Sequence, residues 1–129
     1  MREDKSTCGF ICATIIKMLT VLDDNLTEEQ IHLFENSLAS KLNLSKDDLK
    51  STYFTIDFMM SCAPPEYQCL PLREKTLTQI RVYSGFSSKL SENEKNELIA
   101  IVEDASMDSN LTRPTSTALR NWLLNIYQS

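Results

Sequence analysis

The sequence predicts an all-α protein that forms a single domain over residues 1–129, and three observations carry this prediction. Apolar residues recur at intervals of three and four along almost the whole chain, which is the periodicity of amphipathic helices. Helix-capping signals stand before several of these apolar stripes. The chain has only 2 glycines and 4 prolines, too few turn residues for a sandwich of many short strands.

Three helical segments are predicted in the first half of the chain. The segments and their apolar stripes are about 8–23 (Ile11, Ile15, Met18, Leu22), 27–42 (Ile31, Phe34, Leu38, Leu42) and 45–61 (Leu49, Tyr53, Ile56, Met60). The second begins at a capping box in which the Thr27 hydroxyl reaches a backbone amide and the Gln30 side chain reaches back. Ser45 is a similar cap for the third. Pro64 and Pro65 end the third segment, because proline excludes the helical conformation in the residue before it.

Three more segments are predicted in the second half. They are about 70–88 (Leu77, Ile80, Tyr83), 91–106 (Leu98, Ile101, Val102) and 115–128 (Leu119, Trp122, Leu123, Ile126). Gly85 weakens the end of the first of these, Ser91 and Glu94 form a capping box, and Pro114 precedes the last. Each segment is apolar on one side only, so the segments must bury their stripes against one another in a helix bundle.

Three glycosylation sequons indicate an extracellular protein. They begin at Asn25, Asn43 and Asn110, where the chain should turn or a helix should start. A sequon has meaning only where oligosaccharyl transfer occurs, so the pattern favours a secreted glycoprotein. Residues 1–6 are charged where a signal peptide would turn apolar, so this interpretation assumes that a leader has been removed. A cytosolic N-terminus is the alternative.

Four cysteines fit the same interpretation. Their spacing matches no common structural zinc pattern, so no metal is expected. Two disulfides would join Cys8 and Cys12 to Cys62 and Cys69, in an order that the sequence leaves open. Each bridge would close a loop of about fifty residues, worth roughly 3–4 kcal/mol by chain-entropy reasoning. The alternative is four reduced thiols packed as small apolar groups.

Composition and motifs disfavour an enzyme. His32 is the only histidine, and the chain has no phosphate-binding loop, no GxSxG and no HExxH motif. We therefore expect no catalytic residue and no cofactor. The net charge of −5 disfavours nucleic acid as a partner, and no membrane insertion is expected.

Four patches of the sequence, taken in order, resemble a known family. They are Cys8 followed by residues 15–19 (IIKML), residues 39–48 (ASKLNLSKDD), residues 68–70 (QCL) and residues 115–124 (TSTALRNWLL). Together they resemble the interleukin-4/interleukin-13 family of short-chain four-helix cytokines. The family's cysteine near the C-terminus is absent, Cys12 and Cys62 are additional, and Thr14 replaces a receptor-anchoring glutamate. These departures suggest a divergent member, such as one from a lower vertebrate.

The resemblance implies a four-helix bundle of up-up-down-down order with two long crossover connections. Its main helices would be 8–23, 45–61, 70–88 and 115–128, with 27–42 and 91–106 in the connections or extending their neighbours.

The resemblance also implies a function, that of a secreted monomeric cytokine. It would bring together two class I cytokine receptor ectodomains, a specific alpha chain and a shared second chain. The candidate receptor contacts are Thr14, Lys17, Arg73, Arg81, Lys89, Arg120 and Asn121. Two alternatives stay open: a receptor antagonist of the same fold, and an intracellular helical adaptor with reduced cysteines.

Overall fold

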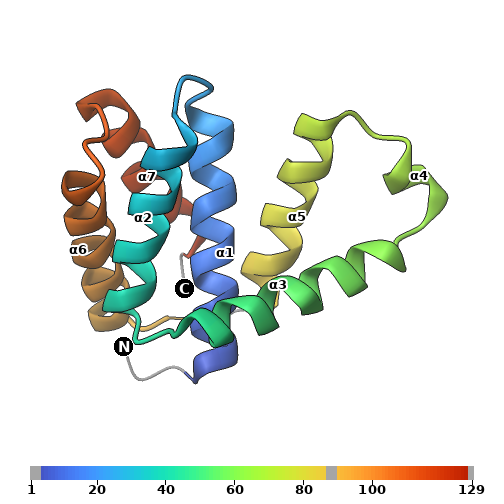
Figure 1. Ribbon diagram of the computed structural model, residues 1–129, viewed down its shortest axis with the longest axis horizontal. Coiled ribbons are helices and arrows are strands. Elements are labelled where there is room, and N and C mark those ends of the chain that lie inside the picture. Colours follow the sequence, from blue (N-terminus) through green and yellow to red (C-terminus); the bar gives the residue numbers. More distant parts are fainter. Residues whose placement is uncertain (1–3, 87–89, 128–129) are drawn as a thin grey trace.

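The computed structural model describes residues 4–86 and 90–127, and these residues form helices and no strand (Figure 1). The predicted all-α class is confirmed. The elements are α1 (Lys5–Leu22), α2 (Glu28–Lys41), α3 (Lys46–Ser61), α4 (Pro65–Gln68), α5 (Leu72–Phe86), α6 (Glu92–Asp108) and α7 (Arg113–Ile126). Each predicted segment corresponds to one of the longer helices.

Side-chain caps fix the start of four of these helices. The predicted capping boxes of α2 and α6 are formed, and Ser45 with Asp48 forms a third one at α3. The first helix begins three residues earlier than predicted, because the Asp4 carboxylate accepts a hydrogen bond of 2.7 Å from the Thr7 amide.

The central element of the fold is α1, which contacts α2, α3, α5 and α7. Ile11, Ile15, Met18 and Leu19 on this helix are fully buried. Its 18 residues, with a mean hydropathy of 1.4, are long and apolar enough to cross a membrane by length and composition. In the structure, 56% of the helix is buried inside the protein, where it forms the centre of the core.

Both α2 and α6 belong to the core, although the sequence analysis placed them in connections or as extensions of their neighbours. They have 14 and 17 residues, contact each other, and bury Phe34, Leu38, Leu98 and Val102. Their apolar stripes need cover as much as those of the other helices do. The short connection at 23–27 makes α2 an antiparallel neighbour of α1. This packing does not confirm an up-up-down-down order.

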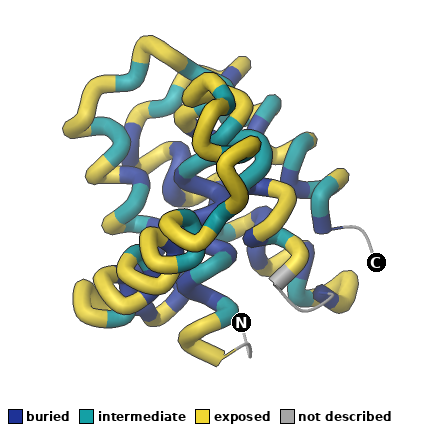
Figure 2. Tube along the Cα trace, turned by 90° about the vertical axis from the view of Figure 1, so that its right-hand side faces the viewer, coloured by how far each residue is buried: buried dark blue, intermediate teal, exposed yellow. Residues whose placement is uncertain are grey.

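A less buried part of the structure is formed by α3, α4 and α5. In Figure 1, α5 lies on the side of α1 opposite to α6 and α7, while α3 crosses α1 near its amino end and runs outward to α4. Tyr83, Ile56 and Ala13 form a second, smaller core there. No residue of α4 is buried. Figure 2 shows buried residues in the interior and exposed residues along the outer faces of the helices.

Candidate functional site

The predicted receptor contacts fall into two groups on different sides of the core. Lys17 is half-buried on α1, and Arg73 and Arg81 are exposed on α5, which packs against α1. Arg120 and Asn121 are exposed on α7. In Figure 1, α5 and α6–α7 flank α1 from opposite sides. Lys89, the remaining candidate on the third main helix, lies outside the described residues.

Thr14 is a correction to the predicted set. It is fully buried, and its hydroxyl donates a hydrogen bond of 2.7 Å to the Phe10 carbonyl oxygen one turn earlier. A threonine can be buried on a helix in this way because its hydroxyl is satisfied by its own backbone. Thr14 is therefore a core residue and cannot be an exposed contact.

The cations of these two groups lie in different electrostatic environments. Burial lowers the pKa of Lys17, and the nearby negative charge of Asp57 partly opposes this effect. The Arg73 guanidinium donates to the carbonyl oxygen of Val21 at 3.5 Å, at the end of α1. Arg120 forms an ion pair of 3.2 Å with Glu103 on α6. The α5 side therefore presents arginines beside α1, whereas on α7 the charge of Arg120 is already neutralised by Glu103.

All three sequon asparagines, Asn25, Asn43 and Asn110, are exposed. Two of them also have a structural role. Asn43 and Asn110 have left-handed backbone conformations, with φ of 59° and 56°. Asparagine tolerates this conformation better than most residues, and it is common directly after a helix.

The two residues that follow Asn43 complete a junction between helices. The Leu44 amide donates to the Ala39 carbonyl at 2.8 Å, which is the Schellman end of a helix, and the Leu44 side chain is buried. The Ser45 hydroxyl then accepts from the Asp48 amide at 3.0 Å and caps α3. The same Asn-Leu-hydroxyl order joins α6 to α7 at residues 110–112. Helix-junction chemistry thus explains the triplet at Asn43 without a glycan. At the second junction it explains Asn110 and Leu111, whereas the Thr112 hydroxyl donates to the Thr115 hydroxyl and makes no cap hydrogen bond.

The cysteines do not form the predicted bridges. Cys12, Cys62 and Cys69 are free thiols in the structure, so neither Cys8 nor Cys12 is joined to the Pro-Pro loop. Cys8 and Cys12 are buried in the core, where burial raises the pKa of the Cys12 thiol to about 12. Cys62 and Cys69 are exposed at the far ends of α3 and α4. The sequence predicts which segment carries each cysteine. It does not predict that α3 runs outward from the core and so separates Cys62 and Cys69 from Cys8 and Cys12.

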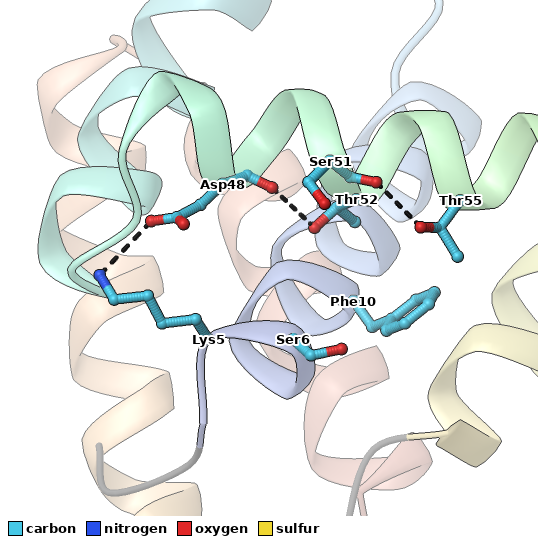
Figure 3. A pocket seen from close by; sticks show the side chains of 7 residues that line it. All are labelled: Lys5, Ser6, Phe10, Asp48, Ser51, Thr52 and Thr55. Atoms are coloured by element: carbon cyan, nitrogen blue, oxygen red, sulfur yellow. Dashed lines mark hydrogen bonds and ion pairs between the residues drawn. The ribbon is translucent and has the colours of Figure 1, made fainter.

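A small polar pocket lies where α1 crosses α3 (Figure 3). Its volume is about 170 Å³. It is lined by Lys5, Ser6, Phe10, Asp48, Ser51, Thr52 and Thr55. The two helices approach closely here because Gly9 has no side chain: a Cβ at Gly9 would overlap the Thr52 hydroxyl.

The hydroxyl groups of this pocket are mostly committed to the protein itself. Thr52 donates to the Asp48 carbonyl at 3.1 Å, and Thr55 donates to the Ser51 carbonyl at 3.0 Å. The Lys5 ammonium donates to the Asn43 carbonyl oxygen at 2.8 Å and pairs with Asp48 at 3.4 Å. The Asp48 carboxylate of this pocket also accepts a hydrogen bond of 2.8 Å from the Ser45 amide, so it is engaged in the cap of α3.

A second pocket, of about 360 Å³, lies between α2 and α3 and includes His32 and Glu35. Its Tyr53 hydroxyl donates a hydrogen bond of 2.6 Å to the Glu35 carboxylate. Burial and this carboxylate raise the Tyr53 pKa, which keeps the phenol protonated. The pair joins the two helices, and the sequence analysis did not predict it.

One exposed feature escaped the sequence analysis. Phe54 and Phe58 stand four residues apart on α3 and are 75% and 63% exposed, respectively. They lie on the face opposite to the buried Leu49 and Ile56, so α3 is apolar on two sides. A count of apolar residues outside the predicted stripe would have found them. Exposed aromatic pairs of this kind are typical of protein-binding surfaces.

No protein-family model, no curated protein and no solved structure matches this chain. The resemblance to the interleukin-4/interleukin-13 family therefore stays a prediction.

Proposed function

We propose that this chain is a secreted cytokine of the interleukin-4/interleukin-13 type, which signals by binding two class I cytokine receptor chains at the cell surface. One observation carries the proposal: the predicted contacts that are at least partly exposed form two separate groups on one core. Lys17, Arg73 and Arg81 belong to the α1–α5 side, and Arg120 and Asn121 belong to α7. A ligand that brings two receptors together needs two such surfaces held at a fixed separation, which lowers the ordering cost of binding.

Each side has a distinct role in this proposal. The α1–α5 side binds the specific alpha chain, because its arginines are exposed on α5, which packs against the helix that carries Lys17, and can meet an acidic receptor surface. The α7 side recruits the shared chain. At the low concentrations of a signalling protein, the ligand acts as a monomer.

Glycosylation belongs to the same proposal. Asn25, Asn43 and Asn110 are exposed and would carry glycans without burying them. The up-up-down-down order is the part of the proposal with the least support, since α2 and α6 pack against each other in the core, α2 beside α1 and α6 beside α7. The predicted disulfide bridges are not part of the proposal.

The test separates binding from signalling. The chain, secreted from cultured vertebrate cells behind a generic leader, would be labelled and applied to leukocytes of a panel of vertebrates. Wild-type protein should show saturable binding, displaced by unlabelled protein, and should raise tyrosine phosphorylation. Arg73→Glu with Arg81→Glu should reduce binding at least tenfold, as charge reversal in an interface does. Arg120→Glu should bind normally but signal weakly.

The matched control is Arg113→Glu, an exposed arginine at the start of α7 that the sequence analysis did not choose as a contact. It should bind and signal as wild type does. Absence of saturable binding to every cell type would overturn the proposal. Normal binding by all variants, with no phosphorylation at any concentration, would instead support the receptor antagonist.

A second candidate, the intracellular helical adaptor, is favoured by a specific observation. Cys12, Cys62 and Cys69 are free thiols, and helix-junction chemistry accounts for the triplet at Asn43 and for Asn110 and Leu111. Such an adaptor would bind its partner through an exposed helix face. It is distinguished by its native location and by the absence of glycans.

A further inference from the structure

The outer face of α3 is formed by Ser51, Phe54, Thr55, Phe58 and Ser61 and is separate from the proposed receptor surfaces. Ser51 and Thr55 form the edge of this face that borders the polar pocket at α1. All five residues are exposed, and at 3.6 residues per turn they cover one side of the helix. None of them is charged. The opposite side, with Leu49, Thr52 and Ile56, is buried against the rest of the protein. The described chain provides no cover for two phenylalanines that are 75% and 63% exposed.

Two of the three polar members of this face, Thr55 and Ser61, would tolerate loss of water. The Thr55 hydroxyl donates to the Ser51 carbonyl at 3.0 Å, and the Ser61 hydroxyl donates to the Phe58 carbonyl at 2.7 Å. Their donors are therefore satisfied within the helix, and covering them leaves no donor without a partner. The face is suited to burial against another helix.

Two charged residues along one edge of the face indicate the identity of the helix that covers it. Lys50 and Asp57 are both exposed and stand seven residues apart, two turns along the same edge. Neither takes part in an ion pair within the described part of the chain, although the charge of Asp57 also acts on Lys17 of α1. If two copies of α3 pair antiparallel about a twofold axis beside Phe54, Lys50 of each copy lies opposite Asp57 of the other. A parallel twofold pair would instead place this edge against the opposite edge of the other copy, where Lys50 and Asp57 would not meet.

From this self-complementarity we propose that a second copy of this chain covers the outer face of α3, in an antiparallel twofold pair. Phe54 meets its counterpart near the axis, Phe58 packs beside Ser51 of the other copy, and two reciprocal Lys50–Asp57 pairs fix the register. The same patch serves both copies, as in the isologous interfaces of most dimers.

The pair is weak because the face is small. Four phenylalanine side chains, about two-thirds exposed, would remove roughly 500 Å² from water. A stable interface buries at least about 1,200 Å² in total. We therefore expect a reversible dimer that forms at high protein concentration. It dissociates to monomers at the low concentrations at which a signalling protein acts.

Sedimentation equilibrium of the full chain, from about 5 µM to 1 mM, tests the proposal. A reducing agent excludes dimers joined through the exposed Cys62 and Cys69. The average mass should rise with concentration from the monomer value of 14.7 kDa toward twice that value. Phe54→Ser and Phe58→Ser should each raise the dissociation constant more than tenfold, as loss of a central aromatic residue does. The control Met107→Ser removes a 70% exposed apolar side chain on α6 and should change it less than twofold.

Charge reversal tests the antiparallel register. Lys50→Glu and Asp57→Lys should each weaken self-association, because each places like charges opposite one another. An equimolar mixture of the two variants should recover dimers, since both facing pairs are again of opposite charge. Far-ultraviolet circular dichroism should show that each variant keeps its helices.

Three results would overturn the proposal. The first is a monomer throughout the concentration range. The second is a dimer that Phe54→Ser and Phe58→Ser leave unchanged. The third is a mixture of the two charge variants that associates no better than either variant alone.

Discussion

Gly9 on α1 and Thr52 on α3 lie so close together that a methyl group at Gly9 would overlap the Thr52 hydroxyl. This contact sets the distance between the two helices at their crossing. It also brings Lys5 and Ser6 near Asp48 in the polar pocket of Figure 3. The crossing thus depends on Gly9, which does not contribute to the hydrophobic periodicity from which the helices are predicted.

Gly9→Ala should destabilise the protein by about 1–3 kcal/mol, because overpacking forces the helices apart. Gly85→Ala is the matched control: a Cβ there meets nothing within 4 Å, so the change should stabilise α5 by up to about 1 kcal/mol. Urea unfolding measures both. In the double variant Gly9→Ala with Thr52→Ala, the hydroxyl is gone and much of the loss should be recovered. Equal stability of Gly9→Ala and wild type would contradict the close crossing.

The helix stripes, the capping boxes and the turns were predictable from the sequence because they depend on neighbouring residues. Which helices pack against each other was not predictable, because this packing depends on contacts between residues far apart in the sequence. The apolar stripes of α2 and α6 show that these helices are buried, but not that they are buried against each other. The resemblance instead implied that these segments lie in the long connections or extend the neighbouring helices.

Thr14 shows a different limit. The sequence analysis considered a single stripe on α1, yet Ala13, Ile16 and Leu19 lie off that stripe and are apolar too. Apolar residues on both sides of a stripe indicate that a helix is buried over most of its circumference. That observation would have placed Thr14 inside the core, where the structure has it.

Tyr53→Phe should destabilise the protein, and Tyr83→Phe should not. The Tyr53 hydroxyl donates to the Glu35 carboxylate at 2.6 Å, and losing this bond should cost about 1 kcal/mol. The Tyr83 hydroxyl is buried without a hydrogen-bond partner among the described residues, so removing it should be neutral or stabilise by up to about 1 kcal/mol. Thermal unfolding of both variants at pH 7 checks the contrast. A larger loss for Tyr83→Phe than for Tyr53→Phe would show that the two environments are wrongly assigned.

Asn43 should be replaceable by glycine but not by alanine. Its φ of 59° is left-handed, a conformation that costs an alanine about 1 kcal/mol and a glycine nothing. Asn43→Gly should therefore keep or slightly raise the free energy of unfolding, and Asn43→Ala should lower it. Chemical unfolding of unglycosylated protein gives the comparison. Indistinguishable variants would remove the structural explanation of this sequon.

The cysteines should differ strongly in reactivity. Cys12 is buried with a pKa raised to about 12, whereas Cys62 and Cys69 are exposed. Only the thiolate reacts with iodoacetamide, so at pH 8 the folded protein should be alkylated at Cys62 and Cys69 and spared at Cys12. Peptide mapping after timed alkylation reads each site, and unfolding in urea should expose Cys12. Early modification of Cys12 in folded protein would contradict the described core.

The mass and location of the native protein test the central claim, secretion, most directly. An antibody raised against the chain would recover it separately from cells of the source organism and from the fluid around them. The recovered protein would be weighed before and after treatment with peptide N-glycosidase. We predict that it is recovered from the fluid, heavier than the bare chain, and loses that excess as Asn25, Asn43 or Asn110 is converted to aspartate. Recovery only from inside the cells, at an unmodified mass, would contradict the secreted cytokine and favour the intracellular adaptor.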